Sequence, residues 1–259
     1  MLKTFAGYSA PVNGINIAPC ILAERELRSN YFPPVEDAIR NTGVLAVMPS
    51  YNEIDGIPSH ANRRLLEDIL RGEWGFKGYT YSDWGGVEFN ASLHRVAAGP
   101  ADAAALALTS GVDLEAPAPT CYQHLAAQVR AGKIRPSEID KATARVLRVK
   151  FLAGLFDGRP DAHHDTLARV ARCAEHVTLS RRVAQESIVL LKNEGQVLPL
   201  DPTRLRSLAV IGPNADQVQF GDYCWTKNNR DGVTVLRGLR EAPGPRVTIR
   251  YAKACDLTR

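Results

Sequence analysis

The residues 44–84, VLAVMPSYNEIDGIPSHANRRLLEDILRGEWGFKGYTYSDW, decide the fold that this sequence predicts. The stretch holds two short apolar runs, at 44–48 and 78–81, and each run ends in polar residues. Between them, residues 62–70 carry apolar side chains at helical spacing. A strand, a helix and a second strand in this order form a βαβ unit, so the stretch predicts a parallel sheet.

Asp83 comes directly after the second of these predicted strands. In parallel α/β barrels, the chemistry takes place just past the carboxyl ends of the strands. This position makes Asp83 the candidate catalytic carboxylate. The alternative is an aspartate that caps the following loop or helix. An isolated aspartate favours that alternative, so the choice depends on the motifs around Asp83.

The rest of the chain continues the pattern of strands and helices. In the first part we expect strands at 3–8 and 112–115, and helices at 24–40 (interrupted at Pro33-Pro34), 62–72, 101–110, 122–131 and 136–156. A polar, turn-rich stretch follows at 157–162. Beyond it we expect helices at 179–191 and 233–239 and strands at 208–211 and 247–252. The pattern predicts an α/β fold in two parts.

The number of predicted units bears on the completeness of the first part. It holds four strand-and-helix units, whereas a closed parallel barrel has eight in roughly 250 residues. We therefore expect the chain to be the middle of a longer protein. We also expect the isolated 259 residues to be inactive and poorly stable, because sheet edges and apolar helix faces would be exposed.

The composition excludes several classes of function. The chain has 259 residues and a formal charge of +4, but its basic residues are interspersed with acidic ones, which argues against nucleic-acid binding. No apolar run approaches the roughly 20 residues that cross a membrane. The five cysteines are widely spaced without a CxxC pair, so neither a zinc site nor a disulfide framework is indicated. Patterns that bind dinucleotides or nucleotide phosphates are absent, and we expect no cofactor and no metal.

Several motifs, taken together and in order, resemble glycoside hydrolase family 3, the β-glucosidases and β-xylosidases. The motifs are ERELR (24–28), MPSYNEIDG (48–56), PSHAN (58–62), EWGF (73–76), SDW (82–84), GVD (111–113), GLF (154–156), ESIVLLKN (186–193), LPL (198–200) and AVIGPNAD (209–216). The resemblance implies a TIM-like (β/α)8 barrel followed by an α/β sandwich. Residues 1–157 would then be the C-terminal half of the barrel, 158–176 a linker, and 177–259 the first part of the sandwich.

The resemblance also implies the roles of individual residues. Members of the family are retaining exo-glycosidases whose nucleophile is the aspartate of the SDW motif, here Asp83. Their acid/base is usually a glutamate in the sandwich, which we expect beyond Arg259. The family usually has Lys-His-Phe where this chain has Lys3-Thr4-Phe5. Lys3 can therefore bind a sugar hydroxyl as in the family, whereas Thr4 cannot supply the imidazole.

Three further residues are candidate substrate contacts. Trp84 and Tyr51 offer aromatic faces on which the C–H face of a sugar ring can stack, and the alternative for both is packing at the mouth of the barrel. Met48 is either the floor of the pocket or part of the core.

Other polar residues near this edge are expected to be structural. Four carboxylates could rival Asp83, and for each we prefer a structural or loop-ordering role: Glu53, Asp55, Asp113 and Glu115. We expect His60 to orient its loop rather than to transfer protons. His163-His164-Asp165 lies in the predicted linker and is interpreted as solvated rather than metal-binding.

The sequence thus predicts a retaining, exo-acting β-D-glycosidase, with a β-glucoside or an oligosaccharide as its substrate. A β-xylosidase and a catalytically inactive remnant that binds sugar are the alternatives. The related single-domain N-acetylglucosaminidases fit less well, because their catalytic Asp-His pair has no counterpart here. The resemblance is compatible with a periplasmic or secreted protein, although no leader is visible, and with a homo-oligomer of the full-length protein.

Overall fold

The computed structural model describes residues 1–158, 164–218, 220–221, 223–224, 232–242 and 246–256. The chain divides into two compact units, Met1–Ala162 and His163–Arg259. The division falls inside the range 158–176 that the sequence predicts to be a linker. That range also contains a helix, α7 (His164–Val170). The domain boundaries themselves stay a prediction.

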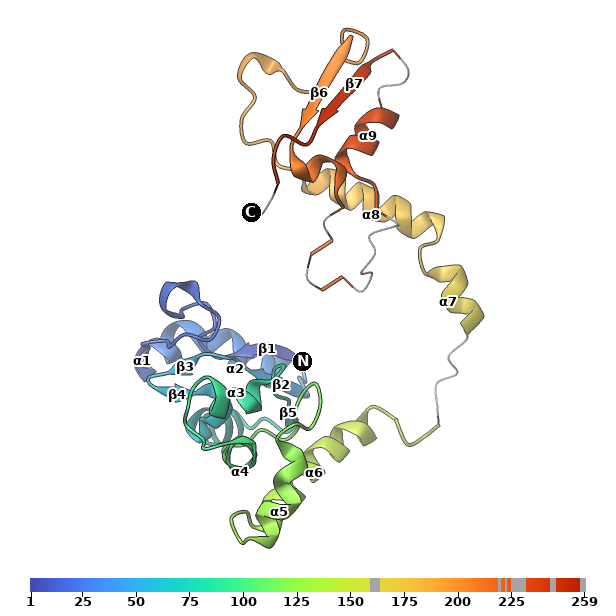
Figure 1. Cartoon of the computed structure of the whole chain (residues 1–259). Helices are drawn as coiled ribbons and strands as arrows, with labels where there is room; N and C mark the ends of the chain where they lie inside the picture. The colour runs from blue at the N-terminus through green and yellow to red at the C-terminus, as the bar shows by residue number, and fades with distance from the viewer. Residues whose placement is uncertain (159–163, 219, 222, 225–231, 243–245, 257–259) are drawn as a thin grey trace. The chain divides into compact units, whose positions relative to one another are not determined.

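The first unit is built on a parallel sheet of three strands in chain order. Its strands are β1 (Leu2–Phe5), β2 (Ala46–Pro49) and β5 (Tyr79–Thr80), which lie side by side in Figure 1. Leu114 continues the sheet through a parallel bridge to Tyr81. The strand predicted at 112–115 is therefore reduced to a single bridge. The four strand positions still follow one another as in successive units of a parallel barrel.

Helical segments connect these strands. The structure places α1 (Glu24–Glu26), the π-helical η2 (Leu27–Tyr31) and α2 (Pro33–Asn41) between β1 and β2. The expected interruption at Pro33-Pro34 is confirmed, because η2 ends at Tyr31 and the two prolines occupy the first turn of a separate helix, α2. Proline is tolerated there, since the N–H that it lacks would have no helical partner.

The remaining elements of the first unit follow in the same alternation. They are the 3-10 helix η1 (Val12–Gly14), the hairpin β3 (Glu53–Ile54) and β4 (Ile57–Pro58), the 3-10 helix η3 (Ser59–Ala61), the π-helical η4 (Arg64–Glu73), α3 (Gly86–Ser92), α4 (Pro100–Ser110), the 3-10 helix η5 (Tyr122–His124), α5 (Leu125–Arg130) and α6 (Pro136–Leu152). Helix α3 was not predicted. It begins directly after the SDW motif and so lies close to the candidate site.

The core of the first unit packs helices against the sheet. Phe5 of β1 contacts Phe32 and Trp74, with ring centroids 5.8 Å and 5.6 Å away. Leu66 and Leu70 of η4 are fully buried in the same cluster. Because these leucines are four residues apart, both side chains lie on one face of the helix. This packing holds η4, and the loops before and after it, against the strands that carry the candidate site.

A buried ionic network ties η4 and α6 to the last strand position. The Asp113 carboxylate accepts hydrogen bonds from Arg71 at 2.6 Å and Arg145 at 2.9 Å, and from the Thr80 backbone N–H at 2.8 Å. Arg145 also binds Glu67 through both of its terminal nitrogens. The two arginines offset part of the cost of burying Asp113, although burial still raises the pKa of this carboxyl above its ordinary value.

The second unit is a smaller α/β arrangement. It contains α7, α8 (Ala174–Ser187), η6 (Glu194–Gln196), β6 (Ser207–Ile211), η7 (Pro213–Asp216), α9 (Val235–Glu241) and β7 (Thr248–Ala252). Strands β6 and β7 pair in parallel along their whole length, as Figure 1 shows. The helix predicted at 179–191 is wrong in its last four residues, because α8 ends at Ser187 and Ile188 is extended. Ile188 and Val189 are β-branched, and such residues favour extended backbone.

The chain is thus an α/β protein with part of a parallel barrel followed by a second α/β unit, and the predicted fold class is confirmed. Among the described residues, no helix has the length and the apolar character needed to cross a membrane.

Candidate active site

Asp83 lies beyond the carboxyl end of β5, in the turn that leads into α3. Only 5% of the residue is exposed. Its Oδ1 accepts a hydrogen bond from the Trp84 backbone N–H at 2.8 Å, and its Oδ2 pairs with Lys3 Nζ at 2.8 Å. Both oxygens are therefore anchored from the protein side, which leaves the carboxylate little freedom to rotate.

Lys3 reaches Asp83 from β1, across the intervening strand β2. The backbone of Lys3 pairs with Met48 in the sheet, and the Lys3 ammonium also contacts Met48 Sδ at 3.1 Å. Met48 is buried beneath this contact, so its thioether supports the lysine. The side chain of Lys3 remains half exposed. The ammonium thus stands at the boundary between Asp83 and solvent, where a bound hydroxyl could reach it.

Tyr51 and Trp84 lie at the same end of the sheet as Asp83. The Tyr51 hydroxyl donates to the Trp84 backbone carbonyl at 2.8 Å, which ties the loop after β2 to the loop after β5. The Trp84 side chain packs edge-on against Tyr81, yet 55% of the residue is exposed. The structure therefore offers an accessible aromatic face next to a held carboxylate.

His60 lies behind this arrangement and is almost fully buried. Its Nε2 accepts a hydrogen bond from the Asp83 backbone N–H at 3.1 Å, and its ring stacks near Tyr51. Burial lowers the pKa of His60 to about 4, an effect that the negative charge of Asp83 partly opposes. The imidazole is neutral at ordinary pH, so it orients Asp83 rather than titrating beside it.

Comparison with known proteins gives the family. A model of the glycosyl hydrolase family 3 N-terminal domain matches residues 1–149, and a model of its C-terminal domain matches residues 188–255. A β-xylosidase of Formosa agariphila and a periplasmic β-glucosidase of Salmonella typhimurium are each 36% identical, over 98% and 99% of this chain.

The chain belongs to glycosyl hydrolase family 3. Among solved structures, a β-glucosidase of Erythrobacter marinus matches with a TM-score of 0.86 and 42% identity over 98% of this chain. A Listeria innocua β-glucosidase in complex with glucose matches with a TM-score of 0.78 and 32% identity over 99% of this chain. The predicted family is confirmed. The chain spans 37% of the length of the Formosa protein and 34% of both the Salmonella and the Erythrobacter proteins.

Within this family 3 chain, three of the four rival carboxylates bond to groups of the surrounding structure. Asp113 belongs to the buried ionic network described above. Glu115 accepts hydrogen bonds from the backbone N–H groups of Cys121 and Tyr122 at the start of a helical segment. Glu53 pairs with His94 at 2.9 Å. Asp55 lies exposed in the β3–β4 turn with φ of 50°.

His94 is a residue of the site region that sequence reasoning missed. Its Nδ1 faces Glu53, and its Nε2 lies 3.0 Å from the Tyr51 backbone oxygen. His94 therefore fixes the loop that carries Tyr51. No local motif marks it, because it lies 41 and 43 residues from its two partners.

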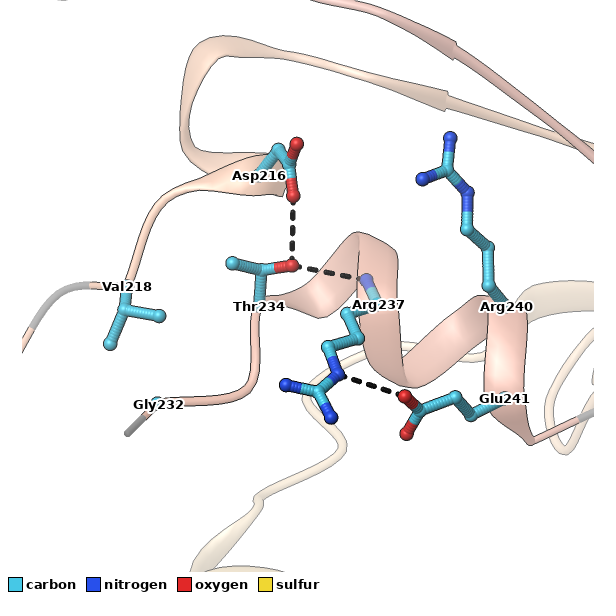
Figure 2. Close-up of a pocket in the computed structure, with 7 residues that line it drawn as sticks. All are labelled: Asp216, Val218, Gly232, Thr234, Arg237, Arg240 and Glu241. Carbon is cyan, nitrogen blue, oxygen red and sulfur yellow. Dashed lines mark hydrogen bonds and ion pairs between the residues drawn. The ribbon is translucent and has the colours of Figure 1, made fainter. Parts of the chain in front are cut away.

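Neither of two hollows in the structure, one in each unit, is lined by Asp83. One is lined by Lys3, Thr4, Tyr8 and Tyr31, among others, but not by Asp83. Another belongs to the second unit and is shown in Figure 2. There Thr234 hydrogen-bonds Asp216 and the Arg237 backbone N–H, while Arg237 pairs with Glu241.

The described residues contain no group of three histidines, cysteines or acids that could hold a metal ion. Asp165 is exposed at the start of α7, whereas His163 of the same motif lies outside the described residues. The roles assigned to Asp83, Lys3, Met48, Tyr51 and Trp84 stay predictions, because the geometry brings these residues together without testing what they do.

Proposed function

We propose that this chain supplies the nucleophile and part of the sugar-binding surface of a retaining, exo-acting β-D-glycosidase, with β-glucosides as its substrates. The supporting observation is the Asp83 carboxylate, which Lys3 and the Trp84 N–H hold at the end of β5 beside an accessible indole. The family relatives, which are β-glucosidases and β-xylosidases, support the same reaction class.

In this reaction an Asp83 oxygen attacks the anomeric carbon from the face opposite the leaving group. The glycosidic C–O bond breaks, a general acid protonates the departing oxygen, and a glycosyl ester forms on Asp83. Water then attacks the same carbon, gives its proton to the same acid/base residue, and releases Asp83 and the sugar with retained configuration. Lys3 would balance the charge of Asp83 before attack and bind a sugar hydroxyl afterwards.

The general acid is not one of the four nearby carboxylates. Glu53, Asp113 and Glu115 are engaged by His94, by arginines and by backbone N–H groups, respectively. Asp55 is exposed in a turn. We therefore place the acid/base outside these residues, in accordance with the family's use of a glutamate from the second domain.

A β-xylosidase is the second candidate, since the Formosa agariphila relative with that name is as similar in sequence as the Salmonella β-glucosidase. The 42% identity to the Erythrobacter marinus β-glucosidase favours the glucoside. Turnover of aryl β-glucoside and aryl β-xyloside, measured side by side, distinguishes the two. A higher kcat/KM on the xyloside would transfer the proposal to that sugar.

The decisive test is substitution of Asp83 in the protein expressed from its complete gene. We expect Asp83→Asn to lower kcat by about 10⁴- to 10⁶-fold, the scale on which enzymes lose rate without their nucleophile. In Asp83→Gly, azide should enter the vacated space and attack dinitrophenyl β-glucoside, which releases dinitrophenolate and gives the α-glycosyl azide. Asp55→Asn is the matched control, since it removes an exposed carboxylate at a position where asparagine tolerates a positive φ. Normal turnover by Asp83→Asn would refute the assignment.

A further inference from the structure

The backbone N–H of Asp83 is held by a side chain rather than by the sheet. In the parallel ladder, Tyr81 N donates to Val47 O and Ser82 N donates to Leu114 O. The next N–H along the chain, that of Asp83, instead donates to His60 Nε2 at 3.1 Å. His60 belongs to η3, 23 residues earlier in the chain. The residue that carries the carboxylate therefore takes its backbone orientation from an imidazole.

The imidazole itself is fixed from its other side. The ring interacts there with the backbone of Ser50, which follows β2, and this interaction favours the protonated form of the ring. Because Nε2 accepts from Asp83, the ring proton that serves Ser50 must be on Nδ1. His60 thus bridges the loops after β2 and β5 in a single neutral tautomer, with each ring nitrogen committed to one loop.

Gly86 leaves the space that the ring occupies. A Cβ at this first residue of α3 would lie 2.3 Å from His60 Nε2 and 2.5 Å from its Cε1. Real Cβ atoms do not approach other atoms so closely, so any larger residue at 86 would displace the ring. The His60 ring thus fills the space beside Gly86, next to the backbone of Asp83.

We propose that His60 is a positioning residue that, through the Asp83 backbone N–H and with Gly86 leaving room for its ring, aims the Asp83 carboxylate at the anomeric carbon. The inference rests on the proposed role of Asp83 as nucleophile. The Trp84 N–H and Lys3 fix the two carboxylate oxygens, whereas His60 fixes the main chain from which the carboxylate projects. Misplacing a reacting group by about 1 Å can cost about 100-fold in rate.

Two substitutions of His60 separate its two hydrogen bonds. Glutamine can place an oxygen where Nε2 lies and so keep an acceptor for Asp83, whereas asparagine can place an amide nitrogen where Nδ1 lies and keep only a donor for Ser50. In the protein from the complete gene, with dinitrophenyl β-glucoside, we expect His60→Asn to lower the rate of glycosyl-enzyme formation by about 10- to 100-fold with KM nearly unchanged. His60→Gln should restore most of that rate. His124→Asn, in η5 and away from Asp83, is the matched control.

Gly86→Ala tests the position of the His60 ring without altering the histidine itself. We expect it to lower the same rate, and its effect should largely disappear when it is combined with His60→Asn, because both changes remove the same contact. Full additivity of the two effects would overturn the proposal. Equal losses in His60→Asn and His60→Gln would also overturn it, as would a wild-type rate in His60→Asn. Thermal unfolding of each variant identifies any loss of rate that comes from unfolding. If a His60 variant unfolds, the effect of Gly86→Ala on the rate decides whether the proposal holds.

The azide experiment on Asp83→Gly separates this inference from the proposed function. If azide yields the α-glycosyl azide while His60→Asn keeps the wild-type rate, Asp83 is the nucleophile and the role of His60 is wrong. If azide yields no glycosyl azide, the proposed function fails whatever the His60 variants do.

Discussion

The two units of the chain bury their apolar side chains to very different extents. In the first unit, Leu66 and Phe5 are fully buried in one continuous cluster that extends from the sheet to η4 and α4. In the second unit, the described residues 188–191 form an apolar run whose last member, Leu191, is 92% exposed. Val177 and Val183 of α8 are exposed as well. Among the described residues, the large buried apolar cluster lies in the first unit, where it supports the loops around the sheet.

This contrast agrees with the place of the candidate site, which lies in the first unit. Asp83, Lys3 and His60 are joined by hydrogen bonds that all lie within the first unit, above a packed core. The hollow in Figure 2, by comparison, is lined by side chains of α9 and η7 that mostly bond to one another. A site needs rigid support to hold reacting groups in place, and the first unit provides it.

The largest expected difference in stability between the two units concerns the loss of unfolding free energy when an ion pair is broken. Asp113→Ala leaves the buried Arg71 and the half-buried Arg145 without their shared partner, and we expect a loss of about 3–5 kcal/mol in the free energy of unfolding. In the second unit, Arg237→Ala breaks an exposed pair with Glu241 and should cause no measurable change. Urea unfolding of both variants measures the difference.

The outcome bears directly on the contrast between the units. If Asp113→Ala unfolds at the same urea concentration as the wild type, the network around Asp113 is not a structural support. If Arg237→Ala is the more destabilised of the two, the second unit contains more internal packing than its exposed apolar residues indicate.

Sequence patterns predicted those parts of the fold that local spacing determines. The apolar runs gave β2 and β5, and the spacing of leucines gave η4, because a buried face repeats with the period of its element. The break at Pro33-Pro34 was also predicted, since proline disfavours the interior of a helix but can begin the next helix at its first turn. Helix α3 was missed because it starts at Gly86, a residue that usually weakens helices.

The candidate site was predicted only in part, for a related reason. The SDW motif identified Asp83 and Trp84, and the strand order placed Tyr51 beside them. The partners of these residues depend on contacts between distant segments, which no local pattern contains. His60 was expected to orient a loop, and it does so by accepting the Asp83 N–H. The role of His94 could not be deduced, since its partners become neighbours only after folding.

A second effect should appear when the pH is lowered. The pKa of His60 is about 4 in the folded chain and about 6.5 when solvated, because burial outweighs the attraction of Asp83 while nearby His94 adds to the lowering. The unfolded state therefore binds more protons between these values, and stability falls as the pH drops from about 6.5 to about 4. His60 alone accounts for a loss of about 3 kcal/mol over this range.

Comparison of variants isolates this contribution. We expect the unfolding free energy of His60→Gln to depend less on pH between 6.5 and 4 than that of the wild type. His176→Gln, at an exposed position on α8 of the second unit, should follow the wild-type curve. Parallel curves for wild type and His60→Gln would mean that His60 is solvated, which contradicts its buried position between the loops after β2 and β5.

The smallest effect concerns two exposed apolar side chains, one in each unit. Trp84 is exposed beside Asp83, and Leu191 is exposed in the second unit, so exposure alone does not distinguish them. If the Trp84 indole stacks on the sugar, Trp84→Ala should raise KM for an aryl β-glucoside by about 3- to 10-fold. Leu191→Ala should leave KM unchanged, whatever it does to stability. An unchanged KM in Trp84→Ala would assign the indole to its edge-on contact with Tyr81 instead. The first unit would then bind the sugar through Asp83 and Lys3, without an aromatic face from Trp84.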